Sequence, residues 1–183
     1  MKYINSEGRM CSLPEPGAED LEQRIERLEA QREISEILFH YTRCVDRGDA
    51  AGVASCYTED GCFYPGDNMP GIQGKDRIFR LFTRLLEPNV QTCAHHICNQ
   101  QLCFLSREEA LVYACFRSCK TFSDGRPEEN CWGGYELRVL READGQWRIK
   151  SHKCFMNNQT GCETPRQREQ LDRPWPPLPE YRL

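Results

Sequence analysis

Hydrophobic residues recur at three- and four-residue intervals through the first half of the chain, a spacing typical of amphipathic helices. Over residues 18–49 this pattern predicts one long helix or two in tandem, with Asp20 suited to its start and Gly48 to its end. The same spacing predicts a short helix within residues 49–60 and a further one at 75–88. The first half of the chain is therefore expected to be mainly helical.

The hydrophobic period then falls to two residues, which is typical of strands with one buried face. Asp124-Gly125 and Asp144-Gly145 provide turn signals between the strands. The strands are expected at 91–105, 110–122, 131–142 and 146–157, with a shorter one within 61–71. Helices followed by an antiparallel meander indicate the α+β class.

The chain of 183 residues is long enough for one domain with a sizeable core. We expect a flexible N-terminal arm at 1–18, a folded domain at 19–160 and a proline-rich tail at 161–183 that extends along a surface or a neighbouring subunit. No apolar run is long enough for a signal peptide or a bilayer span, so a cytoplasmic protein without a membrane partner is expected. The net charge of -4, with no Lys/Arg run, argues against binding to nucleic acid.

The twelve cysteines are numerous for such a chain. No Cys-x-x-Cys motif occurs, and several cysteines stand where Val or Ala would serve in a strand. Because no export signal precedes them, we expect reduced thiols that act as small hydrophobic residues, without structural disulfides.

Two of the four histidines, His95 and His96, are adjacent in the strand-like segment QTCAHHICNQQLCF. Neighbours in a strand point to opposite faces, so only one of them can enter a given site. Nothing nearby completes a ligand set at a suitable spacing, and no metal site is expected. Asp46, at the end of the long helix, could reach one histidine if that helix end packs on the sheet. A carboxylate bonded to one imidazole nitrogen would then make the other a base, although a structural histidine remains the alternative.

Four blocks of the sequence, in this order, resemble the SnoaL-like branch of the nuclear transport factor 2 superfamily. They are REISEILFHYTRCVDRGDAAGVASCYTEDGCFY, GIQGKDRI, AHHICN and LREADGQWRIKSH, and together they span about residues 25–157. The resemblance implies a cone-shaped α+β barrel, in which three N-terminal helices pack into a curved, mostly antiparallel sheet. Members include scytalone dehydratase, hexachlorocyclohexane dehydrochlorinase, diarylpropane lyases, isomerases, cyclases and non-catalytic subunits, so the fold alone leaves the function open.

The resemblance also assigns roles to particular residues. Asp46 and His95 match the acid–base pair of the dehydratase and the dehydrochlorinase, and Asn99 closes the same block as His95. Tyr41 matches a tyrosine that ketosteroid isomerase, another member, uses as an oxyanion donor. The general base of that isomerase would fall near Tyr64 and Pro65, where no acid stands and Asp67 is close but displaced, and this departure favours the Asp–His chemistry.

Four further residues, Tyr64, Tyr113, Arg117 and His152, lie on elements expected to face the cone and are candidates for substrate binding. The alternative for Tyr64 is a place in the core with its hydroxyl at the rim, for Tyr113 and Arg117 an oligomer interface, and for His152 an exposed strand end. The resemblance implies a cofactor-independent lyase acting on a small apolar or aromatic substrate, by dehydratase-, dehydrohalogenase- or deformylase-like elimination. An isomerase or cyclase, or a non-catalytic binding subunit, remains the alternative, and a homo-oligomer, trimer or dimer, is expected.

Overall fold

The computed structural model describes residues 2–4, 10–12, 18–66, 69–86 and 89–160. Its dominant helix, α1 (Leu21–Asp46), is one continuous helix rather than two in tandem. Asp20 begins it with a capping box, because its side chain accepts from the backbone N–H of Gln23 at 2.8 Å and the Gln23 side chain accepts from the backbone of Asp20 at 3.1 Å. Gly48, with a φ of 71°, lies just beyond the C-cap and ends the helix as expected.

The remaining helices are short. Helix α2 (Ala50–Ser55) is capped by Asp49, and α3 (Lys75–Leu85) follows a two-residue strand. Helix α2 is shorter than the sequence pattern predicted, because the chain enters a strand at Tyr57 and buries both Tyr57 and Thr58.

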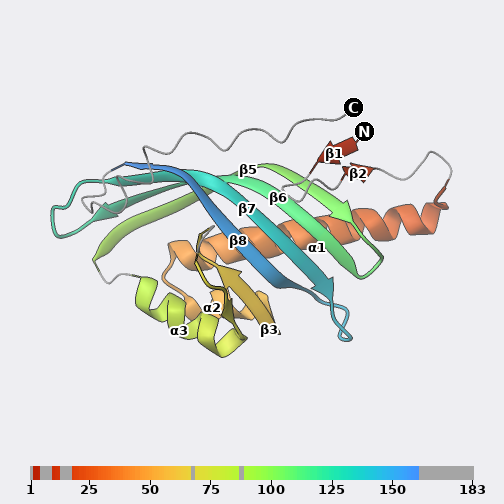
Figure 1. Cartoon of the computed structure of the whole chain (residues 1–183), viewed down its shortest axis with the longest axis horizontal. Helices are drawn as coiled ribbons and strands as arrows, with labels where there is room; N and C mark the ends of the chain where they lie inside the picture. Colours follow the sequence, from red (N-terminus) through yellow and green to blue (C-terminus); the bar gives the residue numbers. More distant parts are fainter. Residues whose placement is uncertain (1, 5–9, 13–17, 67–68, 87–88, 161–183) are drawn as a thin grey trace.

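The main sheet has six strands in the order β4-β3-β8-β7-β6-β5. From β5 to β8 the chain forms the predicted antiparallel meander, and β3 joins β8 in parallel. The strands are β3 (Tyr57–Tyr64), β4 (Ile72–Gln73), β5 (Val90–Phe104), β6 (Glu109–Phe122), β7 (Glu129–Arg141) and β8 (Trp147–Thr160). Helix α1 lies across one face of the long curved strands, while α2, α3 and β3 close the side near the end of α1 (Figure 1). This is the α+β cone that was predicted.

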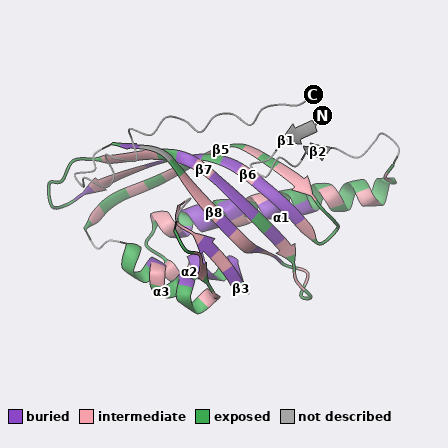
Figure 2. Ribbon diagram, viewed as in Figure 1, coloured by how far each residue is buried: buried purple, intermediate pink, exposed green. Residues whose placement is uncertain are grey.

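The core lies between α1 and the inner face of the sheet (Figure 2). Strand β6 shows the alternation that defines this face: Val112, Ala114 and Phe116 are buried, whereas Cys115 and Arg117 are exposed. The alternation of buried and exposed residues therefore shows which residues of β5 and β6 belong to the inner face of the sheet and which to the outer face.

Outside the main sheet, β1 (Lys2–Ile4) and β2 (Met10–Ser12) form a two-stranded antiparallel ladder within the expected N-terminal arm. The expected tail at 161–183 lies outside the described residues. Within the described residues, none of the helices is long and apolar enough to cross a membrane. Nine of the described cysteines are thiols, but Cys103 is disulfide-bonded, so the expectation of no structural disulfide is wrong at that position.

Candidate active site

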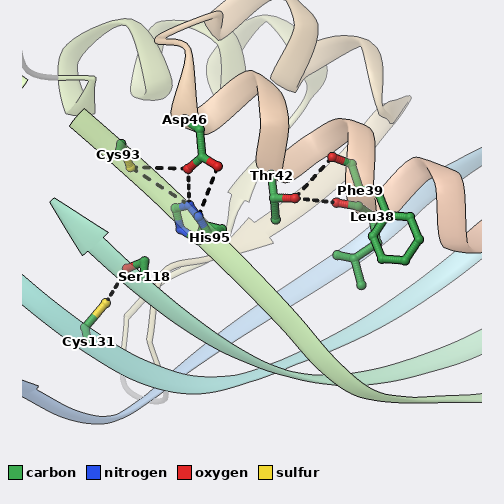
Figure 3. Close-up of polar contacts among 8 residues, drawn as sticks. All are labelled: Leu38, Phe39, Thr42, Asp46, Cys93, His95, Ser118 and Cys131. Carbon is green, nitrogen blue, oxygen red and sulfur yellow. Dashed lines mark hydrogen bonds and ion pairs between the residues drawn. The ribbon is translucent and has the colours of Figure 1, made fainter. Parts of the chain in front are cut away.

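Asp46 reaches the sheet because it continues the buried stripe of α1. Residues at four-residue steps along this helix, Ala30, Ile34, Leu38 and Thr42, are buried against the sheet, and Asp46 is the next member of the series. The Thr42 hydroxyl donates to its own helix, at 3.2 Å from the Leu38 carbonyl oxygen, so Thr42 leaves the Asp46 carboxylate free for other partners (Figure 3). The last turn of the helix thus carries a carboxylate into the space that faces β5.

His95 meets that carboxylate from strand β5. Its Nδ1 lies 2.5 Å from Asp46 Oδ1, and its backbone N–H donates to Asp46 Oδ2 at 3.0 Å (Figure 3). The His95 side chain is 9% exposed and the Asp46 side chain 20%. A carboxylate only accepts hydrogen bonds, so Nδ1 carries the proton and Nε2 of the neutral ring is left as a base. The expected contact between Asp46 and His95 is present.

The strand alternation separates the two histidines as predicted. His95 is half-buried on the inner face, whereas His96 is exposed and lies opposite Arg117 on the outer face. Ser118, the register partner of His95, is buried, and its hydroxyl contacts the Cys131 thiol at 2.8 Å. The site of His95 is therefore a polar patch on the inner face of the sheet.

Cys93 adds a third group to this site. Two residues before His95, it shares the inner face of β5, and its thiol donates to Asp46 Oδ1 at 3.3 Å. Burial, followed by the hydrogen bond and the charge of Asp46, raises the pKa of Cys93 to about 12, so the thiol stays protonated at neutral pH. For Asp46 itself, burial raises the pKa, but the hydrogen bonds from His95 and Cys93 outweigh it and the pKa is lowered. The carboxylate is thus held in its charged form.

Cys93 also corrects an expectation about metals. The prediction that nothing near the histidine pair completes a ligand set is wrong for His95, because the donor atoms of Asp46, Cys93 and His95 lie within 4.8 Å of one another. Cys93 was expected on the same strand face as His95, but as a small hydrophobic residue rather than as a partner of Asp46.

A second polar group lies deeper in the core. His152 is fully buried, and its Nδ1 is 2.9 Å from the Tyr57 hydroxyl. The ring centroids of Tyr41 and Tyr135 lie 4.9 and 4.8 Å from the His152 ring. Burial lowers the pKa of His152 to about 3, so this ring is neutral. Burial also raises the pKa of Tyr41 well above its ordinary value, which keeps that phenol protonated as a hydrogen-bond donor.

An aromatic path joins the two groups. The Phe116 ring lies 6.3 Å from the His95 ring and stacks on Tyr135 at 4.4 Å. Tyr135 in turn contacts Tyr41 and His152. The inner face thus carries a base at one end, phenols and a neutral imidazole at the other, and apolar rings between them.

Several predicted residues lie elsewhere. Tyr113 and Arg117 occupy the outer face of β6, opposite to His95, because they alternate with the buried Ala114, Phe116 and Ser118. The expectation that they face the cone is wrong.

Two more are displaced by local geometry. Tyr64 follows the buried Phe63 in β3 and therefore points to the other side, where its hydroxyl interacts with Cys62. Asn99 is exposed, with a φ of 52° in the irregularity of β5 between Cys98 and Gln101, so it does not join His95. A third candidate, His152, does face the interior of the cone: it is fully buried, and the alternative of an exposed strand end is wrong because β8 continues to Thr160.

A hollow of about 1000 Å³ lies away from this site. It is lined by the first half of α1 and the β5–β6 and β7–β8 turns, including Gln23, Arg27, Leu102, Phe104 and Arg141. Neither Asp46 nor His95 lines it, and the charges that meet there, Arg27 and Glu19, form an ion pair at 3.0 Å rather than a carboxylate bonded to a histidine. The chemistry therefore points to the Asp46–His95 end of the cone.

Comparison with known proteins agrees with this architecture. Residues 26–153 match the family model described as a SnoaL-like domain. Among solved structures, a candidate scytalone dehydratase from Novosphingobium aromaticivorans shares 23% identity at a TM-score of 0.70, covering 77% of this chain and 93% of its own. A type 2 hexachlorocyclohexane dehydrochlorinase (LinA) shares 19% identity at a TM-score of 0.67, covering 75% and 91%.

A ketosteroid isomerase-like protein from Erwinia carotovora shares 19% identity at a TM-score of 0.58, covering 68% of this chain and 94% of its own. The comparison with curated proteins gives no match. At these identities the likeness to solved structures shows the fold alone, whereas the family model covers most of the chain. The chain belongs to the SnoaL-like domain family, with the cone fold of the NTF2-like proteins.

Proposed function

We propose that the protein is a cofactor-independent lyase that uses Asp46 and His95 as a general acid–base pair. The observation that supports the proposal is that the Asp46 carboxylate accepts two hydrogen bonds from His95, one from the ring Nδ1 and one from the backbone N–H. These bonds fix the tautomer and the orientation of the ring, and the charge of Asp46 stabilises the imidazolium that forms when Nε2 takes a proton. Distant structural relatives described as a dehydratase and a dehydrochlorinase support the same class of reaction.

The proposed reaction removes a proton from carbon and expels a group from the neighbouring carbon. His95 Nε2 takes the proton, the electrons of the C–H bond form the new double bond, and the leaving group departs with the electrons of its own bond. Where the leaving group is hydroxide, the proton on His95 returns to it and water is released. Halide needs no such proton. Loss of a small carbonyl fragment would begin instead with removal of a hydroxyl proton: the O–H electrons form the new C=O bond, and the electrons of the broken carbon–carbon bond form the double bond as hydroxide leaves the next carbon and takes up the proton.

The substrate class follows from the inner face. The Phe116 ring lies 6.3 Å from the ring of the base and stacks on Tyr135, and such aromatic surroundings suit a small apolar or aromatic molecule. Tyr41 and Tyr57 are the phenol donors on this face, and with His152 they are the candidates to bind an oxygen of the substrate. The outer-face residues Tyr113 and Arg117 remain candidates for a homo-oligomer interface.

The test is a panel of small aromatic alcohols, halides and hydroxy-carbonyl compounds, assayed in D₂O for both loss of the group and exchange of the carbon-bound proton. Wild type should eliminate at least one compound without added metal or cofactor, and Asp46→Asn should lower that turnover by about 10²–10⁴-fold. Exchange or double-bond migration without loss of a group would identify an isomerase instead. Absence of both reactions across the panel, in protein that is folded, would favour a binding subunit.

A further inference from the structure

Asp46, Cys93 and His95 bring three different donor atoms to one point. Cys93 Sγ lies 3.3 Å from Asp46 Oδ1 and 4.0 Å from His95 Nδ1, and these two atoms are 2.5 Å apart. In the part of the chain that the structure describes, no other group of three His, Cys, Asp or Glu side chains is gathered in this way. Thiolate, imidazole and carboxylate are the protein ligands of zinc-like ions.

The spacing fits a small tetrahedral ion. With zinc–ligand bonds of about 2.0–2.3 Å, neighbouring donor atoms lie about 3.3–3.6 Å apart. The Cys93–Asp46 separation of 3.3 Å lies at the lower end of this range, and the Cys93–His95 separation of 4.0 Å lies slightly above it. The third is the hydrogen bond between Asp46 and His95, which would have to open by about 1 Å when an ion replaces its proton. Asp46 Oδ2 stays anchored on the His95 backbone N–H, so the carboxylate needs only a small rotation.

We propose that these three side chains form an inhibitory site for a thiophilic divalent cation such as Zn²⁺ or Cd²⁺. Cys93 binds as the thiolate and releases one proton to solvent. At a neutral His95 the ion takes Nδ1, and the proton of Nδ1 moves to Nε2, which balances the charge of the ring. A water molecule completes the coordination, since three protein ligands leave one position open.

The consequence for the chemistry is direct, and this part rests on the proposed function. An ion at Nδ1 leaves the proton on Nε2, so His95 has no lone pair with which to take a proton from substrate. Asp46, bound to the ion, no longer supports an imidazolium. The bound cation therefore switches the acid–base pair off, and it does so without entering the aromatic part of the cone.

Binding is tested on the reduced full-length chain with Co²⁺ and Zn²⁺, because a thiolate ligand gives Co²⁺ a near-ultraviolet charge-transfer band. One tight ion per chain is expected, with this band, and Zn²⁺ should displace the Co²⁺. Cys93→Ser should abolish the band and weaken the tight ion by about 100-fold or more, since it removes a direct ligand. Serine can still donate to Asp46, so this variant is expected to keep the hydrogen-bonded pair.

Cys131→Ser is the matched control, because Cys131 is another half-buried thiol near the site but contacts Ser118 rather than Asp46. It should retain the tight ion. Equal binding by wild type and Cys93→Ser would overturn the proposal, since the ion would then sit on other thiols, and so would the absence of tight binding. If an elimination activity is found, Zn²⁺ should inhibit wild type and spare Cys93→Ser, with chelator restoring the rate. Tight binding that requires Cys93, without any elimination activity, would refute only the proposed function.

Discussion

Acidification to about pH 5 should destabilise the fold through His152, whose ring is fully buried. Its Nδ1 is bonded to the Tyr57 hydroxyl, and among the described residues none provides a hydrogen-bond partner for Nε2. Protonating this ring would place a charge among the rings of Tyr41, Phe63 and Tyr135. This burial is why the pKa of His152 falls from an ordinary value of 6.5 to about 3.

The magnitude follows from that difference. Between about pH 6.5 and pH 3 the unfolded chain binds a proton that the folded protein rejects, so the free energy of unfolding falls as the pH falls. The contribution of His152 is fully present above this window and shrinks by about 1.4 kcal/mol for each pH unit within it. From about pH 7.5 to pH 5 the expected loss is about 2 kcal/mol.

The assay is urea unfolding of wild type and His152→Gln at these two pH values. Glutamine does not titrate and can still hydrogen-bond to Tyr57, so the variant should show a pH-dependent loss smaller by about 2 kcal/mol, whatever its absolute stability. His96→Gln is the control, because His96 is exposed and should keep the wild-type pH dependence. An unchanged pH dependence in His152→Gln would refute the reasoning that burial keeps this ring neutral. If His152→Gln fails to fold, His152→Phe serves the same comparison.

Three further predictions concern single positions. A Cβ on Gly133 would lie 1.8 Å from the Phe155 carbonyl oxygen, so Gly133→Ala should lower the free energy of unfolding by about 3 kcal/mol or more in urea titration. Gly134→Ala is the control: the atom nearest to its Cβ lies at 3.5 Å, so this variant should lose about 1 kcal/mol or less. The pKa of Cys93 is raised from 9.0 to about 12, so between these pH values the unfolded chain releases a proton that the folded protein keeps, and the free energy of unfolding falls as the pH rises. Cys93→Ser should therefore lose less stability than wild type between pH 9 and pH 12 in urea titrations. Arg117→Ala should keep wild-type turnover on any substrate that the panel identifies, because Arg117 faces away from His95; a large loss of turnover would argue against this placement.

The two central residues were predicted from the sequence and the family resemblance together. Strand alternation shows only that His95 and His96 face opposite sides, and the resemblance selected His95; Asp46 was expected because it stands at the end of the long helix, and the structure shows that it continues the buried series of α1. The order of the elements was also readable, because the hydrophobic period changes once, from helical to strand-like, and turn signals separate the strands.

The remaining site residues depend on register and strand limits, which local patterns do not determine. Tyr113 and Arg117 were expected inside, but the pairing of β6 with β5 puts Ser118 opposite His95 and turns both outward. Tyr57 was not predicted as a site residue because it falls within the segment that was expected to be helical. In the structure β3 already begins at Tyr57, and the side chain is buried in the core. Tyr135 is positioned by its ring contacts with Phe116 on the neighbouring strand and with Tyr41 and His152, which the sequence alone does not reveal.

Catalysis by the inner-face histidine is tested by comparing the turnover of His95→Ala with that of His96→Ala, on the best substrate of the panel and at equal thermal stability. We expect a loss of about 10²–10⁴-fold for His95→Ala and near wild-type turnover for His96→Ala, because only the inner-face histidine is bonded to Asp46. An active His95→Ala beside an inactive His96→Ala would contradict this expectation, since catalysis would then lie on the outer face of the sheet.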